Sequence, residues 1–470
     1  MVQGVAIEGG AIVDVNPATG EEIARVPVST PEEIDAAVAA AAAAQPAWAA
    51  TPLSARIKRL SAVSRLLAEQ HEELARLVTR EMGKTIGEAR AEVSGAADKA
   101  EFLCLVEQAN LGAALVLREP HGVVAVCAPW NFPVDEILLL ALPALAAGNA
   151  LVLKPSEVAP LCGATVAAAL RDALHAFPGV VGLVQGDGRV GAALVAHPRV
   201  GFVGMTGSSA TGAAIAQAAG GALKRAVLEL GGKDAMIVFA DADLRLAARD
   251  AVANSLSNAG QVCCSVERVY VDAGVREQFE ALVVAEARGY AAADGMDEAA
   301  RMGPLVSRVQ RAHVHAHVEA AVRAGARCLL GGELPAEEAR GNFYPPTVLA
   351  DVPQGCVAMR EETFGPVVAM SAFDGGEESA VALANDSEYG LSACVYSEDI
   401  ERAARVAARL HAGQVGINNW PLENAPLQCP WVGHKKSGFG FHSGADGWRQ
   451  FSVPKSIIFN PGSELPQSIP

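Results

Sequence analysis

Residues 123–154 read VVAVCAPWNFPVDEILLLALPALAAGNALVLK. The stretch begins and ends with short runs rich in valine and leucine, at 123–127 and 150–154, as buried strands do. Between them lies an apolar segment with the length of a helix, which ends before Gly148 and Asn149. Two apolar strands that are joined by a helix usually lie parallel in one sheet, and both faces of that sheet must be covered. The stretch therefore predicts one strand–helix–strand unit of a parallel sheet.

The same alternation continues along most of the chain. Further strands are predicted at 180–185, 200–204, 225–230, 235–239, 267–271, 367–373, 391–396 and 414–418. Helices are predicted at 31–44, after a capping box at Thr30, and at 55–80, 87–107, 243–259 and 307–324. Because 470 residues exceed what one hydrophobic core normally holds, the pattern predicts an α/β protein with two doubly wound α/β domains.

Composition and charge argue against a nucleic-acid partner and a membrane span. Apolar residues make up 51% of the chain and charged residues 19%, as in a folded protein. The 37 basic and 53 acidic residues give a formal charge of −16, which repels a nucleic-acid backbone. Pro143 interrupts the most apolar segment, 137–153, whereas a bilayer span needs about 20 uninterrupted apolar residues.

The cysteines and histidines do not form a recognisable metal motif. Nine cysteines occur without metal-ligand spacing and no secretory signal opens the chain, so reduced thiols and a cytoplasmic location are expected. His313 and His317, in the segment HVHAH, have a spacing compatible with a metal on one helix face. No acidic or cysteine ligand accompanies them, so a solvated helix face is predicted and no metal.

Ligands of doubly wound sheets bind beyond the carboxyl ends of the strands. The segments that follow predicted strands are 129–133, 154–157, 186–188, 205–208 and 229–232. Residues 186–191 match the pattern G-x-G-x-x-G, but no acidic residue for the ribose hydroxyls occurs between Arg189 and Leu228. The glycine pattern alone therefore does not indicate an ordinary dinucleotide site.

Two other strand-end segments carry suitable groups for a nucleotide. Glu157, beside Lys154, is an acid that could bind ribose hydroxyls. Gly207 and Gly212 open a predicted helix whose backbone N–H groups suit a phosphate. An ordinary surface ion pair remains the alternative for Lys154 and Glu157.

Two adjacent cysteines, Cys263 and Cys264, stand where a predicted helix meets a predicted strand, in the segment NAGQVCCS at 258–265. A free cysteine is most often a small hydrophobic residue of a core, so the pair alone does not establish chemistry. A reactive thiol that attacks a carbonyl needs a base and an oxyanion donor close by. Other segments must supply both.

Seven segments carry a resemblance to a known family. They are PWNFP at 129–133, KPSE at 154–157, 202–212 around TGS, LELGGK at 228–233, GQVC at 260–263, EETFGP at 361–366, and 435–440. In this order and at this spacing, the chain from Asn16 to Ser456 resembles the aldehyde dehydrogenase superfamily, in its NAD(P)-dependent, non-acylating form. The resemblance implies a nucleotide-binding domain, a catalytic domain and a small β oligomerisation arm.

The resemblance implies the following chemistry. The Cys263 thiolate attacks the aldehyde carbon, because that carbon is a poor hydride donor until it is tetrahedral. The Asn131 side chain and the Cys263 backbone N–H stabilise the oxyanion. Hydride transfer to the nicotinamide leaves a thioester, and Glu229 activates the water that hydrolyses it. Cys264 is expected to be structural, and capping of the following helix remains the alternative for Asn131.

The cofactor is expected to be NAD, with NADP possible. Residues that match cofactor-binding positions of the family are Trp130, Lys154, Ser156, Glu157, Gly207, Ser208, Leu230, Gln310, Glu362 and Phe364. A carboxylate at Glu157 binds the ribose hydroxyls of NAD and repels the 2′-phosphate of NADP. Loop packing remains the alternative for Glu362 and Phe364.

Several substrate classes stay open. Family members that oxidise succinate semialdehyde carry an arginine where this chain has Leu139, and no arginine set for a phosphate is recognisable, so a neutral aliphatic or aromatic aldehyde is expected. A semialdehyde or a phosphorylated aldehyde is the alternative. Asp135-Glu136 faintly resembles the Asn-Glu of family members that oxidise glyceraldehyde 3-phosphate. The segment GFGFH at 438–442 departs from the family's G-x-G-R-E and leaves the substrate mouth in doubt. A CoA-acylating dehydrogenase and a non-catalytic binding protein are weaker alternatives, because Glu229 favours water and the catalytic residues are all present.

The resemblance also gives domain boundaries. Residues 1–109 and 123–230 are expected to form the nucleotide-binding domain, 231–445 the catalytic domain, and 110–122 with 446–470 the arm. Because such an arm presents strand edges to another subunit, a homodimer or homotetramer is expected.

Overall fold

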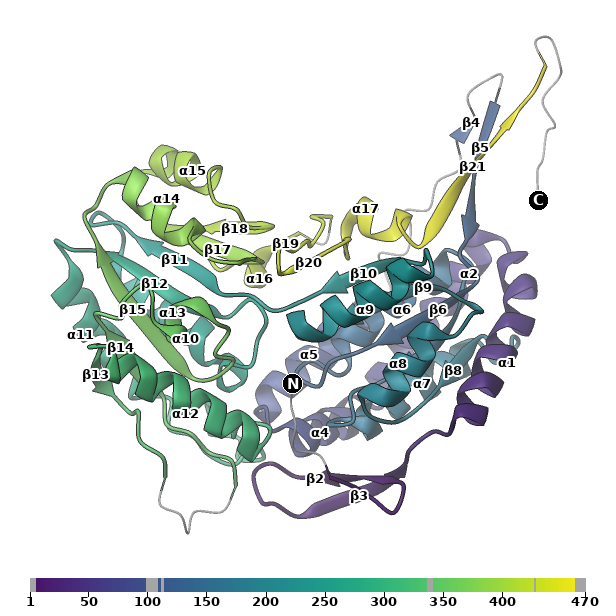
Figure 1. The fold of residues 1–470 in the computed structure, drawn as a ribbon, viewed down its shortest axis with the longest axis horizontal. Coiled ribbons are helices and arrows are strands. Elements are labelled where there is room, and N and C mark those ends of the chain that lie inside the picture. The colour runs from purple at the N-terminus through teal and green to yellow at the C-terminus, as the bar shows by residue number, and fades with distance from the viewer. Residues whose placement is uncertain (1–5, 99–108, 111–113, 336–340, 427, 461–470) are drawn as a thin grey trace.

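The computed structural model describes residues 6–98, 109–110, 114–335, 341–426 and 428–460. Two parallel sheets form its centre, the first on the right and the second on the left of Figure 1. The link at residues 230–233 joins the last parallel strand of the first sheet to the first strand of the second. The predicted α/β class with two doubly wound sheets is confirmed.

The first sheet has the strand order β20-β10-β9-β6-β7-β8. Its parallel strands are β6 (Val123–Cys127), β7 (Ala150–Lys154), β8 (Val181–Leu183), β9 (Val200–Thr206) and β10 (Arg225–Glu229). The short strand β20 (Gly438–Phe439) pairs with β10 in the antiparallel sense. The connecting helices are α6 (Asp135–Ala146), α7 (Pro160–Ala173), α8 (Gly188–Ala196) and α9 (Ser209–Gly221). The first helix, α1 (Pro31–Ala49), packs on β7 and β8.

The second sheet has the order β13-β14-β15-β12-β11-β17-β18. Its parallel strands are β11 (Asp234–Val238), β12 (Val266–Asp272), β14 (Thr347–Ala350), β15 (Val367–Phe373), β17 (Ser392–Tyr396) and β18 (Gln414–Ile417). The antiparallel edge strand is β13 (Arg327–Leu330). The accompanying helices are α10 (Leu244–Leu256), α11 (Arg276–Ala287), α12 (Arg308–Arg323), α13 (Val357–Arg360), α14 (Glu377–Asn385) and α15 (Ile400–Ala407).

Three small sheets complete the described structure. The first contains β1 (Ala6–Glu8), β2 (Ala11–Val15) and β3 (Glu22–Pro27), the second contains β16 (Tyr389–Gly390) and β19 (His434–Lys435), and the third contains β4 (Ala109–Asn110), β5 (Ala114–Pro120) and β21 (Ser452–Ile458). The third extends away from the first sheet at the upper right of Figure 1. The short helices α16 (Pro421–Asn424) and α17 (Gly444–Arg449) precede β21 in the chain.

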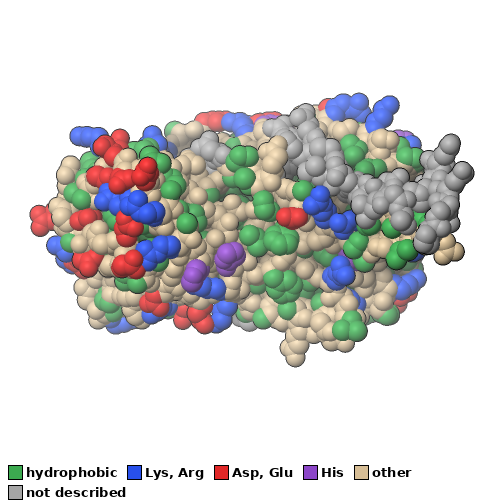
Figure 2. Space-filling model, turned by 90° about the horizontal axis from the view of Figure 1, so that it is seen from above, with side chains coloured by type: hydrophobic (Ala, Val, Ile, Leu, Met, Phe, Trp, Pro, Cys, Tyr) green, Lys and Arg blue, Asp and Glu red, His purple; other side chains and the backbone are tan. Residues whose placement is uncertain are grey.

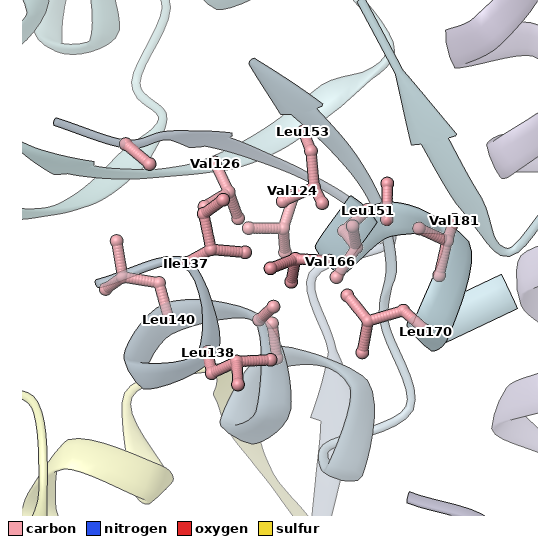
Figure 3. Packing of buried hydrophobic residues seen from close by; sticks show 14 of the residues in the cluster. Val124, Val126, Ile137, Leu138, Leu140, Leu151, Leu153, Val166, Leu170 and Val181 are labelled. Carbon is pink, nitrogen blue, oxygen red and sulfur yellow. The ribbon is translucent and has the colours of Figure 1, made fainter. Parts of the chain in front are cut away.

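The core of the first sheet explains why residues 123–154 fold as they do. In Figure 3, side chains of β6 and β7 face apolar side chains of α6 and α7. The labelled members of this cluster are Val124, Val126, Ile137, Leu138, Leu140, Leu151, Leu153, Val166, Leu170 and Val181. Burying one such side chain contributes about 1.5–3 kcal/mol. The described residues of the second sheet form a separate buried cluster.

Three expectations about the elements were wrong in detail. The helix predicted at 55–80 is three helices, α2 (Leu53–Leu60), α3 (Ala62–Glu69) and α4 (His71–Met82), because tight turns interrupt it. The helix predicted at 87–107 is α5 (Ile86–Asp98), and 99–108 lie outside the described residues. The helix predicted at 243–259 ends at Leu256, and the backbone turns left-handed from Asn258.

The surface carries ion pairs rather than a single charged field. At the left of Figure 2, above the second sheet, acidic and basic side chains are interspersed. Arg405 and Arg409 of α15 pair with Glu377 and Glu378 of α14, at 2.8 and 2.5 Å. Exposed pairs of this kind contribute about 0–1 kcal/mol each. Among the helices in the described ranges, none is long and apolar enough to cross a bilayer.

Candidate active site

The carboxyl ends of the parallel strands bring the predicted residues to one edge of the first sheet. β7 and β9 lie on opposite sides of β6, so the order of connection reverses there, which is where doubly wound sheets bind ligands. Trp130 and Asn131 follow β6, and Lys154 ends β7. Gly207 follows β9, and Glu229 ends β10.

Glu229 is enclosed without a hydrogen-bond partner. The residue is 4% exposed, and neither Oε1 nor Oε2 accepts a hydrogen bond within the part of the chain that the structure describes. Burial raises the pKa of the Glu229 carboxyl well above its usual range, and the negative charges of Glu136 and Cys263 raise it further. Leaving a buried acceptor unsatisfied costs about 1–3 kcal/mol, and such groups are typical of sites that bind a ligand or exchange a proton.

A second carboxylate lies beside Glu229. The parallel pairing of β9 and β10 places Thr206 next to Glu229. The Thr206 hydroxyl donates a hydrogen bond of 2.9 Å to Oε2 of Glu136, on the first turn of α6. Leu140, one turn further along α6, lies over Gly204, two residues earlier on β9. The helix thus positions Glu136 over the end of β9, where two neighbouring carboxyl groups resist ionising together.

The segment before Cys263 has an unusual backbone. Asn258, Ala259 and Gly260 have φ angles of 49°, 56° and 73°, in the left-handed region. This conformation costs about 1–2 kcal/mol for each non-glycine residue. At Gly260 a Cβ atom would lie 2.0 Å from the Gly365 carbonyl oxygen, so only glycine fits there. The turn brings Cys263 out of the path of α10, just before β12 begins.

A network of amides joins this turn to Asn131. Asn131 Nδ2 donates to the Gln261 carbonyl at 3.0 Å, and Asn258 Nδ2 donates to the Asn131 carbonyl at 3.3 Å. Gln261 Nε2 donates to the Asn258 carbonyl at 2.9 Å, and Gln261 Oε1 accepts from the Val306 N–H at 2.9 Å. The Asn131 amide therefore lies beside the cysteine segment and does not cap α6, which begins after Val134 without a side-chain cap of its own.

The two cysteines have different surroundings. Cys264 is 1% exposed, and its carbonyl accepts a hydrogen bond of 3.0 Å from Trp420 Nε1. Cys263 is partly exposed and packs against the second core. The hydrogen bond with the Cys264 side chain, and then burial, raise the pKa of the Cys263 thiol well above its usual range. The thiol must lose its proton before its sulfur can react as a nucleophile.

Lys154, Ser156 and Glu157 form a compact group at the end of β7. Lys154 is 6% exposed, and its Nζ donates to the Pro155 carbonyl at 2.8 Å and lies 3.4 Å from Glu157 Oε2. The Ser156 hydroxyl accepts a hydrogen bond from the Val158 N–H at 3.2 Å. A buried lysine that holds a half-buried carboxylate at a strand end is not an ordinary surface pair.

The glycine-containing segments behave differently from one another. Ser208 caps α9 and accepts from the Thr211 N–H at 3.3 Å, so Gly207 directly precedes the cap of a helix N-terminus at the strand edge. The G-x-G-x-x-G segment also opens a helix, α8, and there Asp187 caps it by accepting from the Arg189 N–H at 2.9 Å. The Asp187 carboxylate therefore already accepts a hydrogen bond from a backbone N–H at the start of α8.

The remaining predicted residues lie where the two sheets meet. The Leu230 N–H donates to the Ser437 carbonyl at 3.1 Å. Glu362 Oε1 accepts from the Gly232 N–H at 3.2 Å, and burial raises the pKa of the Glu362 carboxyl to about 8. The rings of Phe364 and Trp130 lie edge to face, with centroids 5.5 Å apart.

Gln310 is the predicted residue whose amide is engaged elsewhere. Its Nε2 donates to the carbonyls of Phe364 and Thr363, at 2.9 and 3.3 Å. Gln310 therefore fixes the loop that carries Phe364, and a direct contact with a cofactor stays a prediction.

A family model described as "Aldehyde dehydrogenase family" matches residues 5–457. The chain belongs to the aldehyde dehydrogenase family. Its activity is therefore the NAD(P)-dependent oxidation of an aldehyde, and the predicted resemblance is confirmed.

Similar proteins include bacterial enzymes of known name. A betaine aldehyde dehydrogenase of Cereibacter sphaeroides is 40% identical over 463 residues, covering 97% of this chain and 95% of the relative. The crystal structure of aldehyde dehydrogenase C from Pseudomonas syringae, in complex with NAD+ and octanal, matches with a TM-score of 0.93 at 36% identity, covering 97% and 95% of the two chains. Lactaldehyde dehydrogenase from Escherichia coli matches with a TM-score of 0.91 at 35% identity, covering 96% of each chain.

Three acidic residues of this aldehyde dehydrogenase were missed as site residues. Glu88 and Glu92 lie on α5, and Glu136 lies on α6. The signal was present for the first two, since they occupy one face of a helix at a spacing of one turn. Glu88 also lines a pocket of ≈ 280 Å³ together with Ser257 and Trp420, next to the cysteine segment.

The histidines of α12 are not a solvated face as predicted. His317 is 5% exposed, and its Nδ1 lies 3.2 Å from the Thr363 hydroxyl, while His315 contacts the Tyr344 hydroxyl. Burial lowers the pKa of His317 to about 3, so its ring is neutral. Only His313 is exposed. The expectation failed because α12 packs this face against the 363–365 loop; in the described ranges, no group of three potential ligands could hold a metal.

Proposed function

We propose that this aldehyde dehydrogenase oxidises an uncharged aliphatic or aromatic aldehyde to its carboxylic acid, with NAD as cofactor and Cys263 as the nucleophile. The observation that carries the proposal is Glu229, a carboxyl enclosed near the Cys263 segment with both oxygens unpartnered. A structural acid would be hydrogen-bonded there, whereas a general base must leave its oxygens available to water.

The proposed reaction assigns one task to each residue. The Cys263 thiol first releases its proton to solvent, its sulfur then bonds to the aldehyde carbon, and the carbonyl oxygen becomes an oxyanion. Asn131 uses one N–H for the Gln261 carbonyl, so its second N–H can donate to the oxyanion together with the Cys263 backbone N–H. After the carbon has lost its hydride, Glu229 takes a proton from water, whose oxygen displaces the Cys263 sulfur from the thioester.

The residues at the strand edge fit the proposed cofactor, which supplies the hydride acceptor when bound. The Glu157 carboxylate, held by buried Lys154, can accept hydrogen bonds from two ribose hydroxyls. The N-terminus of α9, with Gly207 and Ser208, offers N–H groups to a phosphate. Trp130 and Phe364 are proposed to flank the nicotinamide.

Acidic and apolar residues on α6 support an uncharged substrate. The helix presents Asp135 and Glu136 in its first turn and Leu139 one turn later. Carboxylates repel an anionic aldehyde, so succinate semialdehyde and phosphorylated aldehydes are expected to be poor substrates. A neutral aldehyde encounters no such repulsion.

A cationic aldehyde is the second candidate, because one specific observation favours it. The negative charge of Glu136 reaches the Cys263 thiol, whose pKa it helps to raise. Such a charge would attract a quaternary ammonium aldehyde, and several similar enzymes are named betaine aldehyde dehydrogenase.

A substrate panel tests these proposals. Octanal, benzaldehyde, betaine aldehyde and succinate semialdehyde are compared by kcat/KM, each with NAD and with NADP, and the product is identified as free acid or acyl-CoA. We expect octanal or benzaldehyde with NAD to be best and the free acid to form. A preference for betaine aldehyde would favour the second candidate, and equal efficiency with NADP would contradict the role of Glu157.

We also propose that the chain forms a homodimer or homotetramer through the arm, and that the boundaries given above separate the domains. β5 pairs with β21 along seven residues, and β21 is an edge strand of this sheet. Such an edge favours pairing with another chain. A monomeric mass in light scattering would contradict the assembly.

A further inference from the structure

Helix α5 carries two glutamates, Glu88 and Glu92, that contact opposite sides of the proposed site. They are one turn apart and therefore share a face of the helix. Glu88 is half-buried and Glu92 is buried. The chemistry proposed above does not use either of them.

Glu92 caps helix α6 from outside that helix. Its Oε1 accepts hydrogen bonds from the N–H groups of Val134 and Asp135, at 2.9 and 3.2 Å. Because α6 lacks a side-chain cap of its own, this carboxylate satisfies donors that the first turn leaves unpaired. Its Oε2 accepts from Lys84 Nζ at 2.7 Å, and this nitrogen lies 3.8 Å from the ring centroid of Phe132. Both contacts fix the segment that carries Asn131.

Glu88 holds the left-handed turn before the nucleophile. Its Oε1 accepts from the Asn258 N–H at 2.6 Å and from the Ser257 hydroxyl at 3.2 Å. Its Oε2 accepts from the N–H and hydroxyl of Thr85, at 3.0 and 2.8 Å, so the carboxylate is itself fixed. Asn258 is the first residue with positive φ, and its contact with Glu88 tethers a conformation that the backbone disfavours.

Amide hydrogen bonds join the two held segments. Asn131 Nδ2 donates to the Gln261 carbonyl, two residues before Cys263, and Asn258 Nδ2 donates to the Asn131 carbonyl. Oxyanion stabilisation depends on the position of the Asn131 amide relative to the Cys263 sulfur and N–H. One rigid helix that contacts both segments sets that relative position.

We propose that Glu88 and Glu92 are positioning residues, and that α5 holds the Asn131 amide in register with Cys263. This inference rests on the proposed roles of Asn131 and Cys263. The effect falls on kcat, because the oxyanion forms during the reaction, and leaves the KM for NAD unchanged. A purely structural role would lower stability and affect all kinetic constants alike.

The first test compares Glu88→Gln and Glu88→Ala with Glu298→Gln. Glu298 pairs with Arg90 of α5 at 2.8 Å, so it also joins α5 to a distant segment, but it does not contact the site. We expect kcat to fall about tenfold in Glu88→Gln and about a hundredfold in Glu88→Ala, as misplacement of reacting groups by about 1 Å does. The KM for NAD should stay within about twofold, and Glu298→Gln should match the parent within about twofold.

A double-mutant cycle separates positioning from a general loss. If Glu88 acts through Asn131, Glu88→Ala should cost much less kcat in an Asn131→Ala background than in the parent. Full additivity, or a kcat for Glu88→Ala within about twofold of the parent, would overturn the inference. Activity that survives in Cys263→Ser would instead refute the proposed function, whatever the behaviour of Glu88.

Glu92 is tested without leaving a buried lysine unpaired. The variants Lys84→Met/Glu92→Gln and Lys84→Met/Glu92→Met both remove the ammonium group and keep an apolar contact with Phe132. Only glutamine keeps an acceptor for the Val134 N–H. We expect the glutamine variant to retain at least about threefold more kcat, with an equal KM for NAD. Equal kcat in the two variants would show that the cap does not position the site.

Discussion

The first and second sheets deliver their parts of the site by different means. Glu229 stands at the end of a regular strand, where parallel neighbours fix its place. Cys263 follows a turn with three consecutive left-handed residues, held by contacts with residues distant in the chain. The first arrangement follows from the fold itself, whereas the second depends on particular side chains. The position of the base is therefore robust to local substitutions, whereas the position of the nucleophile is sensitive to them.

The largest effect is expected from the cysteines themselves. Cys263→Ser should lower the rate of aldehyde oxidation by about 10⁴-fold or more, because a serine hydroxyl without a paired base is a poor nucleophile. Cys264→Ser should retain activity within about tenfold, because the Cys264 side chain is buried and takes no part in the proposed reaction. Both are measured as formation of reduced cofactor. Comparable losses in the two variants would mean that the pair acts as a unit.

Glu229→Gln should separate the two halves of the reaction. We expect the steady-state rate to fall about 10²–10⁴-fold, because general-base catalysis of hydrolysis is lost. A rapid first turnover of reduced cofactor should remain, since within the described residues the Glu229 carboxyl accepts no hydrogen bond from the Cys263 turn. The measurement is a stopped-flow burst, with Thr206→Val as a neighbouring control. Loss of the burst would assign Glu229 to deprotonation of the thiol as well.

The sequence was sufficient for the parts of the site that depend on regular elements. The strands that end at Cys127, Lys154 and Glu229 could be read from apolar runs, and parallel pairing then places their ends together. The resemblance supplied the chemical roles, which periodicity alone did not. The helix bounds around the nucleophile were wrong because propensity does not report a left-handed turn at Ala259.

The contacts that fix the turn could not be predicted for a different reason. Glu88 and Asn258 are 170 positions apart in the chain, and their contact depends on how α5 packs against the turn. The same holds for Glu136, whose place beside Glu229 depends on how α6 crosses β9. Such long-range polar contacts leave no local periodic signal.

Glu136→Gln should shift the pH dependence of the hydrolytic step. The raised pKa of Glu229 means that its basic form, and hence hydrolysis, increases as the pH rises through that pKa. Removing the Glu136 charge lowers the Glu229 pKa, so the rising limb should move to lower pH. Glutamine keeps an acceptor for the Thr206 hydroxyl. Asp135→Asn on the same turn is the control, and an equal shift in both variants would contradict a specific pairing.

The smallest expected effect is on the free energy of unfolding, when alanine is replaced by glycine in the left-handed turn and in helix α1. Ala259→Gly relieves a left-handed alanine, worth about 1–2 kcal/mol, but loses a buried methyl group and adds freedom to the unfolded chain, so the free energy of unfolding should change by less than about 0.5 kcal/mol. Ala36→Gly, at an exposed position of α1, should lower it by about 1 kcal/mol. Urea unfolding measures both. A larger loss at Ala259 than at Ala36 would mean that the turn is not strained, and its tether to Glu88 would then need another explanation.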